Sequence, residues 1–257
     1  MQVTVLGCGT STGVPVIACP CAVCHSNNPK NNRTRSSLLI RTDSGKNIVV
    51  DTGPEFRIQA LRESLTSLDA VLYTHLHADH CHGFDDVRAF RFLDRRPISC
   101  YMARDFQEEF RQRFAYAFTD LGYAGTRPEV DMYEIPDDGI FTVGGQEVES
   151  FRVAHGVVQT SVFRFESFAY ATDYKAFTEE QIERWRGKVR VMISSGIHFR
   201  DHPSHSTIPQ TLALFEKLEV EHGIISHLSH EVDFERDRSK LPAHVEFAYD
   251  GMKLSIS

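Results

Sequence analysis

The sequence of 257 residues lacks several features that would each indicate a particular class of protein. No apolar run approaches the length needed to span a membrane, and the first six residues lack the basic and apolar regions of a signal peptide. No internal repeat or linker interrupts the chain, which predicts a single domain over residues 1–257. We therefore expect a cytoplasmic globular protein that has no membrane partner.

An excess of positive charge is also missing. Lys and Arg number 28 against 35 Asp and Glu, which gives a formal net charge of −7. A protein that binds duplex nucleic acid needs a basic face for the phosphates, so this balance argues against such a partner. A small anionic substrate is not excluded, because bound metal ions can supply positive charge locally.

Histidine, by contrast, is concentrated in one stretch. Residues 74–83 read T-H-L-H-A-D-H-C-H-G and follow the apolar run 70–73, which predicts a buried strand. Imidazole nitrogens and carboxylate oxygens suit zinc, manganese or iron, and so dense a cluster rarely serves packing. If the donors divide into two pairs, two neighbouring metals can be held. The candidate ligands in this stretch are His75, His77, Asp79 and His80.

The six cysteines are unevenly distributed. Cys19, Cys21 and Cys24 form a C-x-C-x-x-C run. A disulfide within this run leaves one thiol unpaired, and in a cytoplasmic chain closely spaced cysteines more often bind metal. Three thiolates supply three ligands of a tetrahedral zinc site, and the fourth ligand must come from elsewhere. The candidate for that fourth ligand is His230.

Other polar residues occur where predicted strands end. Asp51 follows the strand 48–50 and precedes Thr52-Gly53, a position that suits either a residue that orients its neighbours or a simple turn. Three more polar residues stand at the ends of predicted strands in the second half of the chain, and each of them also fits a buried polar residue with ordinary partners. These are His155, Asp173 and His227.

Aromatic residues are concentrated in the segment 104–127. Four of them recur at intervals of four residues, which predicts one apolar face of an amphipathic helix. They are Phe106, Phe110, Phe114 and Phe118. Packing of this face on the core is one interpretation, and a lid over the site or a homodimer face are the alternatives.

The H-x-H-x-D-H pattern of residues 75–80 resembles the signature of the metallo-β-lactamase superfamily of metal-dependent hydrolases. The resemblance extends over nearly the whole chain, from Gly7 to Met252. It implies an α+β fold, an αββα sandwich of the metallo-β-lactamase type, with a two-metal site at one edge. It also implies a glycine loop beside the site, which residues 7–13 match.

The resemblance implies roles for individual residues. One divalent metal, Zn or Mn, would be bound by His75, His77, His155 and Asp173. The other would be bound by Asp79, His80, His227 and the same Asp173. Asp51 would support the histidine loop from outside the ligand set, and Asp79 and His205 would be the catalytic residues, with His205 contacting phosphate or acting as general acid. His198 and His202 are weaker candidates, and Ser195 departs from the family pattern, which often has Asp there.

The cysteine run narrows the resemblance. A subset of the superfamily pairs the same run with a late H-x-x-H, here residues 227–230, and so binds one structural zinc. That subset includes the phosphoribosyl 1,2-cyclic phosphate phosphodiesterases of the carbon–phosphorus lyase pathway. We therefore expect hydrolysis of small cyclic phosphodiesters, such as that compound or 2′,3′-cyclic nucleotides, by a hydroxide activated between two metals.

Two alternatives remain open from the sequence. The same ligands serve hydrolases of thioesters, lactones or RNA ends, although nothing here resembles the long Gly/Pro-rich arm of tRNA 3′-end endonucleases. A cofactor-biosynthesis branch shares the cysteine run, has an eroded catalytic set and contains non-catalytic accessory proteins. All the expected ligands are present in this chain, which favours an enzyme with about three metal ions rather than about one.

Overall fold

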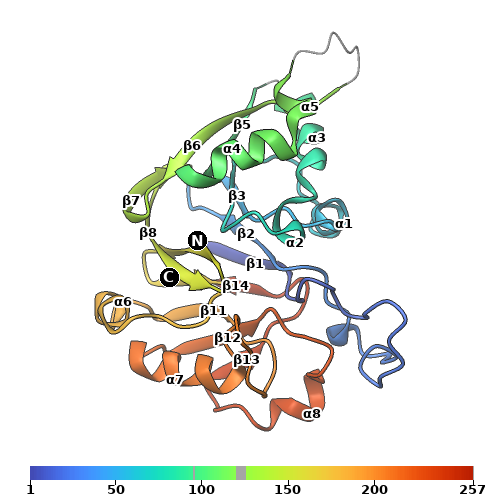
Figure 1. Cartoon of the computed structure of the whole chain (residues 1–257), viewed down its shortest axis with the longest axis vertical. Coiled ribbons are helices and arrows are strands. Elements are labelled where there is room, and N and C mark those ends of the chain that lie inside the picture. Colours follow the sequence, from blue (N-terminus) through green and yellow to red (C-terminus); the bar gives the residue numbers. More distant parts are fainter. Residues whose placement is uncertain (95, 120–125, 257) are drawn as a thin grey trace.

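The computed structural model describes residues 1–94, 96–119 and 126–256 (Figure 1). Within this part of the chain, two seven-stranded sheets form the centre of the molecule. The strand order is β14-β1-β2-β3-β4-β5-β6 in the first sheet and β13-β12-β11-β10-β9-β8-β7 in the second. The chain passes from one sheet to the other between β6 and β7, and it returns to the first sheet with β14.

The first sheet is built mainly from the first half of the chain. Its strands are β1 (Gln2–Gly7), β2 (Ser37–Arg41), β3 (Asn47–Val50), β4 (Ala70–Leu72), β5 (Ile98–Ala103), β6 (Val130–Ile135) and β14 (Lys253–Ser255). β1 to β3 pair antiparallel, whereas β3 to β6 run parallel. Short apolar runs such as Ile48–Val50 form strands buried on both faces, as a parallel arrangement with covered faces requires.

The second sheet follows the same plan. Its strands are β7 (Asp138–Val143), β8 (Gln146–His155), β9 (Val158–Phe165), β10 (Phe168–Ala171), β11 (Val191–Ser195), β12 (His222–Ser226) and β13 (Val245–Phe247). β7 to β10 form an antiparallel meander, and β10 to β13 run parallel. Within each sheet, therefore, the strands of the parallel part all end at the same edge of that sheet.

Helices cover the outer faces of the two sheets (Figure 1). On the first sheet they are α1 (Phe56–Arg62), α2 (Ala78–Cys81), the 3₁₀ helix η2 (Phe84–Val87), α3 (Arg88–Asp94), α4 (Arg104–Arg113) and α5 (Ala115–Phe118). On the second sheet they are α6 (Glu179–Trp185), α7 (Ile208–Leu218) and α8 (Phe234–Arg238). A further 3₁₀ turn, η1, spans Pro29–Asn31. None of the described helices has the length and apolarity needed to cross a membrane.

Three apolar clusters hold these layers together. The central cluster lies between the sheets and joins side chains such as Ile40 and Phe163. The outer clusters join the helices to the sheets, with Phe110 on one side and Trp185 on the other. The layers are therefore helix, sheet, sheet and helix, and the predicted αββα sandwich is confirmed.

The aromatic segment differs from the single helix that its spacing predicts. The chain leaves the helical conformation at Phe114, with φ −113° and ψ 38°, so that α4 and α5 are separate helices. Phe106, Phe110 and Phe114 are buried in the cluster beneath the first sheet's helices, which supports the core interpretation over a lid or a homodimer face. Residues 120–125 of this segment lie outside the described residues.

Candidate metal centre

The candidate ligands lie at one edge of the sandwich, where strands of both sheets end. In the first sheet, Asp51 follows β3 and the histidine loop follows β4. In the second sheet, β8 ends at His155, and Asp173 and His227 follow shortly after β10 and β12. Because parallel neighbouring strands end at the same edge, residues that are far apart in the sequence meet there.

The histidine loop is held by the turn that follows β3. Thr52 donates its N–H to the carbonyl of His80 (2.8 Å) and accepts the N–H of Gly83 (2.9 Å) on its own carbonyl. A Cβ atom at Gly53 would lie 2.3 Å from the carbonyl oxygen of Asp79, so only glycine permits this approach. The D-x-G pattern therefore has a structural reason, which is to let the backbone pack directly on the loop.

Three overlapping groups of possible ligand atoms form at this edge, and His75, His155 and Asp173 each belong to two of them. The ligand atoms of His75, His77 and His155 lie within 4.8 Å of one another. The carboxylate of Asp173 forms one group with His75 and His80 and another with His155 and His205.

The carboxylate of Asp173 is therefore shared by two groups of imidazoles. Its Oδ2 atom is 2.8 Å from Nε2 of His80, and its Oδ1 atom is 3.0 Å from Nε2 of His227. Asp79 Oδ2 lies 3.2 Å from the same Nε2 atom of His80. Asp173 also lies 4.0 Å from Nε2 of His155, a member of the first group. One carboxylate therefore faces both sets of imidazoles, which suits a bridging ligand.

Outer hydrogen bonds fix the orientation of two imidazoles from the first sheet. His80 donates Nδ1–H to Asp51 Oδ2 (2.6 Å). The hydroxyl of Thr74 donates to the same Asp51 atom (2.8 Å), so it accepts from Nδ1–H of His75 (3.0 Å). The Nε2 atoms of both rings face the centre. The carboxylates of Asp173, Asp51 and Asp79 outweigh burial and raise the pKa of His80 well above its usual value, so a bound metal ion would replace the Nε2 proton of this ring.

The same arrangement occurs on the second sheet. His155 donates Nδ1–H to the carbonyl of Ser204 (3.1 Å). The hydroxyl of Ser36 donates to the carbonyl of Gly9 (2.9 Å) and so accepts Nδ1–H from His227 (3.1 Å). Four imidazoles therefore direct their Nε2 atoms into one small space, as histidines that bind a metal do.

The chemistry of this donor set fits divalent metal ions. The Nε2 atom of His75 is buried, yet it makes no hydrogen bond to any described residue. A buried polar atom without a partner costs about 1–3 kcal/mol. A metal ion would satisfy this atom, and the mixture of imidazole and carboxylate suits zinc or manganese.

Electrostatics keeps the carboxylates ionised. Burial opposes ionisation of Asp173, but the nearby imidazoles of His227 and His80 outweigh it and hold the pKa of this carboxyl well below its usual range. The pKa of Asp79 is lowered in the same way, since His80 outweighs the effect of burial. Burial, only partly offset by Asp173, lowers the pKa of His227 to about 4. The lowered pKa favours the neutral form of this imidazole, which is the form that binds metal.

The backbone is strained at three of these positions. Asp51, Asp173 and His227 have φ values of 62°, 51° and 55°. Residues other than glycine adopt such left-handed conformations at a cost of roughly 1–2 kcal/mol each. The strain occurs where strands end and the chain must turn to direct a side chain into the centre.

The remaining candidates lie close by. His205 Nδ1 is 3.1 Å from Asp173 Oδ1, and its ring is stacked on that of His227. The ring of His202 contacts the ring of His205, and the ring of His198 in turn contacts that of His202. Ser195 ends β11 with a buried hydroxyl that has no hydrogen-bond partner among the described residues.

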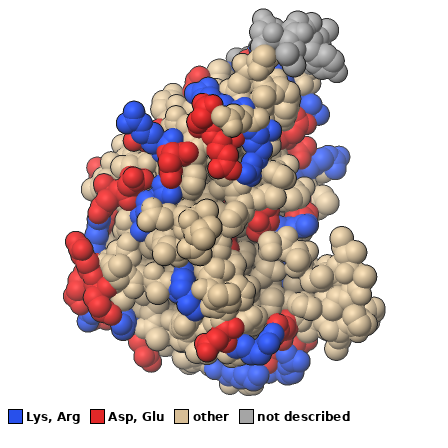
Figure 2. Space-filling view, viewed as in Figure 1, with Lys and Arg blue, Asp and Glu red and all other residues tan. Residues whose placement is uncertain are grey.

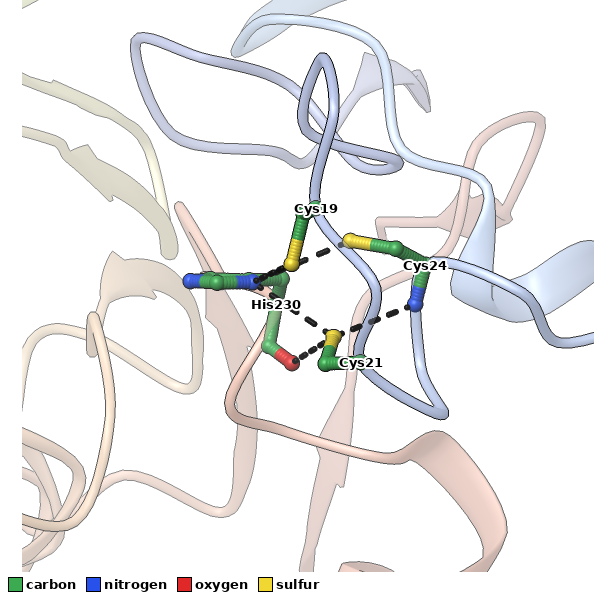
Figure 3. A group of neighbouring side chains, drawn as sticks. All are labelled: Cys19, Cys21, Cys24 and His230. Atoms are coloured by element: carbon green, nitrogen blue, oxygen red, sulfur yellow. Dashed lines mark hydrogen bonds between the residues drawn. The ribbon is translucent and has the colours of Figure 1, made fainter.

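The cysteine run forms a separate cluster with His230, as Figure 3 shows. The Nδ1 atom of His230 lies 3.2, 3.5 and 3.7 Å from the sulfur atoms of Cys19, Cys21 and Cys24. All three thiols are free, so the structure contains no disulfide within the run. A hydrogen bond from the backbone N–H of Cys24 is the main cause that lowers the pKa of Cys21 to about 6. Three sulfurs and one imidazole at these separations fit a tetrahedral zinc site.

Two kinds of contact were not predictable from the sequence. Ser36 and Thr74 orient histidines through hydroxyl groups, and only the position of Thr74 at the end of a strand gave any signal. The acceptor for His155 is a backbone carbonyl, which leaves no trace in the sequence.

Comparisons with known proteins place this geometry in a family. Residues 46–228 match the family model described as the β-lactamase superfamily domain. A solved structure of a diphosphatase from the PhnP family is 34% identical, covers 100% of this chain and 98% of its own, and superposes with a TM-score of 0.91. Zinc-bound PqqB from Methylobacterium extorquens superposes with a TM-score of 0.81 at 18% identity, covers both chains completely and supports the fold alone.

The curated relatives are longer than this chain. An octanoyltransferase of Porphyromonas gingivalis is 37% identical over 258 residues, which is 100% of this chain but 52% of that protein. A ribonuclease Z of Protochlamydia amoebophila is 24% identical over 139 residues, 52% of this chain and 44% of the relative. The chain thus spans about half the length of these two curated relatives.

Proposed function

This chain belongs to the β-lactamase superfamily, and from that premise we propose that it is a metal-dependent phosphodiesterase. Its substrates would be small, preferably cyclic, phosphodiesters such as phosphoribosyl 1,2-cyclic phosphate or 2′,3′-cyclic nucleotides. The observation that carries the proposal is the convergence of the Nε2 atoms of His80, His155 and His227 on the carboxylate of Asp173. The relationship to a diphosphatase and to a ribonuclease Z supports chemistry at phosphorus.

Two divalent metals fit the centre. His75, His77 and His155 would hold one metal, and Asp79, His80 and His227 the other, with Asp173 shared between them. When bound, such metals act as Lewis acids on a phosphoryl group and lower the pKa of water. The third metal, a structural zinc, would be held by Cys19, Cys21, Cys24 and His230.

His205 is the residue we propose for proton transfer. Its side chain is 16% exposed at the rim of the centre, and its Nδ1 atom lies 3.1 Å from Asp173 Oδ1. A protonated imidazole at this position can bind a phosphoryl oxygen or donate Nδ1–H to the departing alkoxide. A five-membered cyclic phosphate also releases ring strain when the bond breaks.

The surface and the thiols support the expected partners and location. On the face shown in Figure 2, acidic and basic side chains are interspersed, as the net charge of −7 suggests. This distribution supports a small substrate rather than duplex nucleic acid. All six cysteines are free, which supports a reducing compartment such as the cytoplasm. We further propose that residues 1–257 act as one domain.

A thioester hydrolase is the second candidate function. The octanoyltransferase relative is the observation that favours it, because that name implies acyl chemistry. This chain corresponds to only 52% of that protein, so its name describes a protein with about as many residues again outside the shared part. The metal centre itself does not discriminate, since the same ligands can polarise a carbonyl or a phosphoryl group.

Comparison of three substrates tests the proposal. The rates on bis(p-nitrophenyl) phosphate, p-nitrophenyl phosphate and an octanoyl thioester are measured with added manganese or zinc. We expect turnover of the diester, and loss of at least about 100-fold in Asp79→Ala because a metal ligand is removed. Asp85→Ala is the matched control, since Asp85 lies near the loop but bonds to Tyr116 instead. Turnover of the thioester alone would move the assignment to the second candidate.

A further inference from the structure

The loop between β11 and α7 contains a histidine whose ring is used differently from those of the metal centre. The Nδ1 atom of His202 accepts hydrogen bonds from the backbone N–H groups of Ser204 (3.3 Å) and His205 (3.1 Å). This atom must therefore carry a lone pair, which places the proton of the neutral ring on Nε2. The four outer-bonded histidines of the metal centre use Nδ1 in the opposite way, as a hydrogen-bond donor.

The two backbone groups held by His202 lead directly to the metal centre. The carbonyl of Ser204 accepts Nδ1–H of His155 (3.1 Å). The following residue, His205, has Nδ1 3.1 Å from Asp173 and its ring centroid 5.1 Å from that of His227. The imidazole of His202 therefore holds the backbone of Ser204, whose carbonyl accepts from the candidate ligand His155. It also holds the backbone of His205, the candidate general acid.

The turn that contains His202 is anchored by Lys175. The backbone carbonyl of His202 accepts a hydrogen bond from Nζ of Lys175 (2.6 Å). The backbone N–H of Lys175 donates to the carbonyl of Ala154 (2.8 Å). Ala154 directly precedes the candidate ligand His155, and Lys175 stands two residues after Asp173, so the turn is tied to the strand ends that carry these ligands. Movement of the turn would therefore displace both His155 and Asp173.

We propose that His202 is a positioning residue of the phosphodiesterase site. Its Nδ1 atom holds the 202–205 turn closed, which directs His205 toward the substrate and keeps the carbonyl of Ser204 against His155. The effect on catalysis rests on the proposed function, because it operates through His205. The effect on metal binding operates through His155 and does not depend on the substrate.

Two substitutions separate the hydrogen-bond acceptor from the bulk of the ring. In His202→Asn, the amide oxygen stands the same number of bonds from Cα as Nδ1 does, so the acceptor is kept. His202→Phe keeps a ring of similar size but removes the acceptor. We expect the Phe variant to lose roughly 10–100-fold in kcat with a smaller change in KM, and the Asn variant to stay within about threefold of wild type.

Metal affinity gives a readout that does not depend on turnover. Outer partners of metal-bound histidines typically contribute about 10–100-fold to affinity. Competition with a chelator should therefore show weaker binding at the catalytic centre in His202→Phe, near the lower end of that range, and wild-type affinity in His202→Asn. Thermal unfolding of both variants shows whether the fold is retained.

The tautomer of His202 can be observed directly. Long-range ¹H–¹⁵N spectra of the zinc-loaded protein should show the proton of His202 on Nε2. A proton on Nδ1, equal losses in both variants, or wild-type behaviour of His202→Phe would each overturn the proposal. If wild-type protein hydrolyses no diester, the proposed function fails, while the tautomer and the metal affinities still decide the role of His202.

Discussion

The carboxylate of Asp51 is the acceptor on which the orientation of His80 depends. It is fully buried and receives three hydrogen bonds, from Nδ1–H of His80 and from the hydroxyl and backbone N–H of Thr74. Thr74 in turn orients His75. One side chain outside the ligand set thus fixes the tautomers of two imidazoles.

Replacement of Asp51 by Asn should weaken metal binding at the catalytic centre. An amide group offers only one acceptor atom, so one of the three donors loses its partner. We expect the catalytic metals to bind about 10–100-fold more weakly, measured by competition with a chelator, while the cysteine site keeps its affinity. Asp85→Asn serves as the control. Unchanged affinity in Asp51→Asn would show that the carboxylate does not orient the histidines.

At the scale of single residues, the sequence identifies the side chains that can bind metal better than it identifies the residues that orient them. His75, His77, Asp79 and His80 could be recognised because four metal-binding side chains within six residues have no common structural role. The hydroxyl of Ser36 could not, since its contact with His227 depends on how two loops pack. Burial and tautomers are properties of the folded chain.

At the scale of elements, α4 connects the aromatic segment to the histidine loop. Arg113, the last residue of α4, donates from Nη1 to the carbonyl of Leu76, which stands between His75 and His77. The same atom lies 3.4 Å from the sulfur of Cys81, beyond His80. The buried phenylalanines of α4 hold the helix in place, so that its arginine can bridge the two ends of the loop.

Removal of this bridge should disturb catalysis more than binding. In Arg113→Met the loop keeps its ligands but loses its tether to α4. We expect kcat on the diester to fall about tenfold with little change in KM, because misplaced groups lose catalytic geometry. Arg111→Met is the matched control on the same helix, since the guanidinium of Arg111 lies over the ring of Phe118 rather than on the histidine loop. Equal kinetics of the two variants would contradict this role for α4.

Most elements could be predicted from the sequence, and the exceptions have physical reasons. Apolar runs such as residues 48–50 and 70–73 predicted β3 and β4 within one or two residues. β13 and β14 were missed because each has three residues with a charged residue among them, so neither shows a period or the continuous apolar run that indicated β4. The break at Phe114 was missed because the aromatic spacing continues through it, and packing rather than spacing ends α4 there.

At the scale of the whole molecule, the cysteine cluster joins distant parts of the chain. Cys19 and His230 are 211 residues apart, and the cluster fastens the loop before β2 to the segment that follows β12. His230 stands three residues after His227, a candidate catalytic ligand. A zinc ion at this site would therefore stabilise the fold close to the catalytic centre without taking part in the reaction.

Substitution of His230 tests this separation of roles. His230→Ala should lower the metal content from about three to about two ions per chain and lower the melting temperature, because a structural zinc contributes to folding. Diester turnover with excess manganese should fall less than in Asp79→Ala. His25→Ala is the matched control, because His25 lies in the same loop, is outside the Cys19–Cys21–Cys24–His230 cluster, and bonds through Nδ1 to the carbonyl of Cys21. Loss of two metals in His230→Ala would contradict independent sites.

The pairing of strands across the molecule was beyond sequence analysis. The contact of β14 with β1 joins Gln2 to Ser255, and no local pattern indicates such a pair. The αββα arrangement could be expected only from the resemblance to a family. The metal centre likewise depends on strand pairing between distant segments, since His227 follows β12, one of the last strands of the second sheet.

The late position of β14 has a consequence for synthesis on the ribosome. A nascent chain of this protein exposes the outer edge of β1 until residues 253–255 have emerged, because those residues form its only neighbour on that side among the described strands. At typical elongation rates this interval lasts on the order of ten seconds or more. An unpaired strand edge attracts other chains. Molecular chaperones that shield such edges during translation should therefore raise the yield of folded protein.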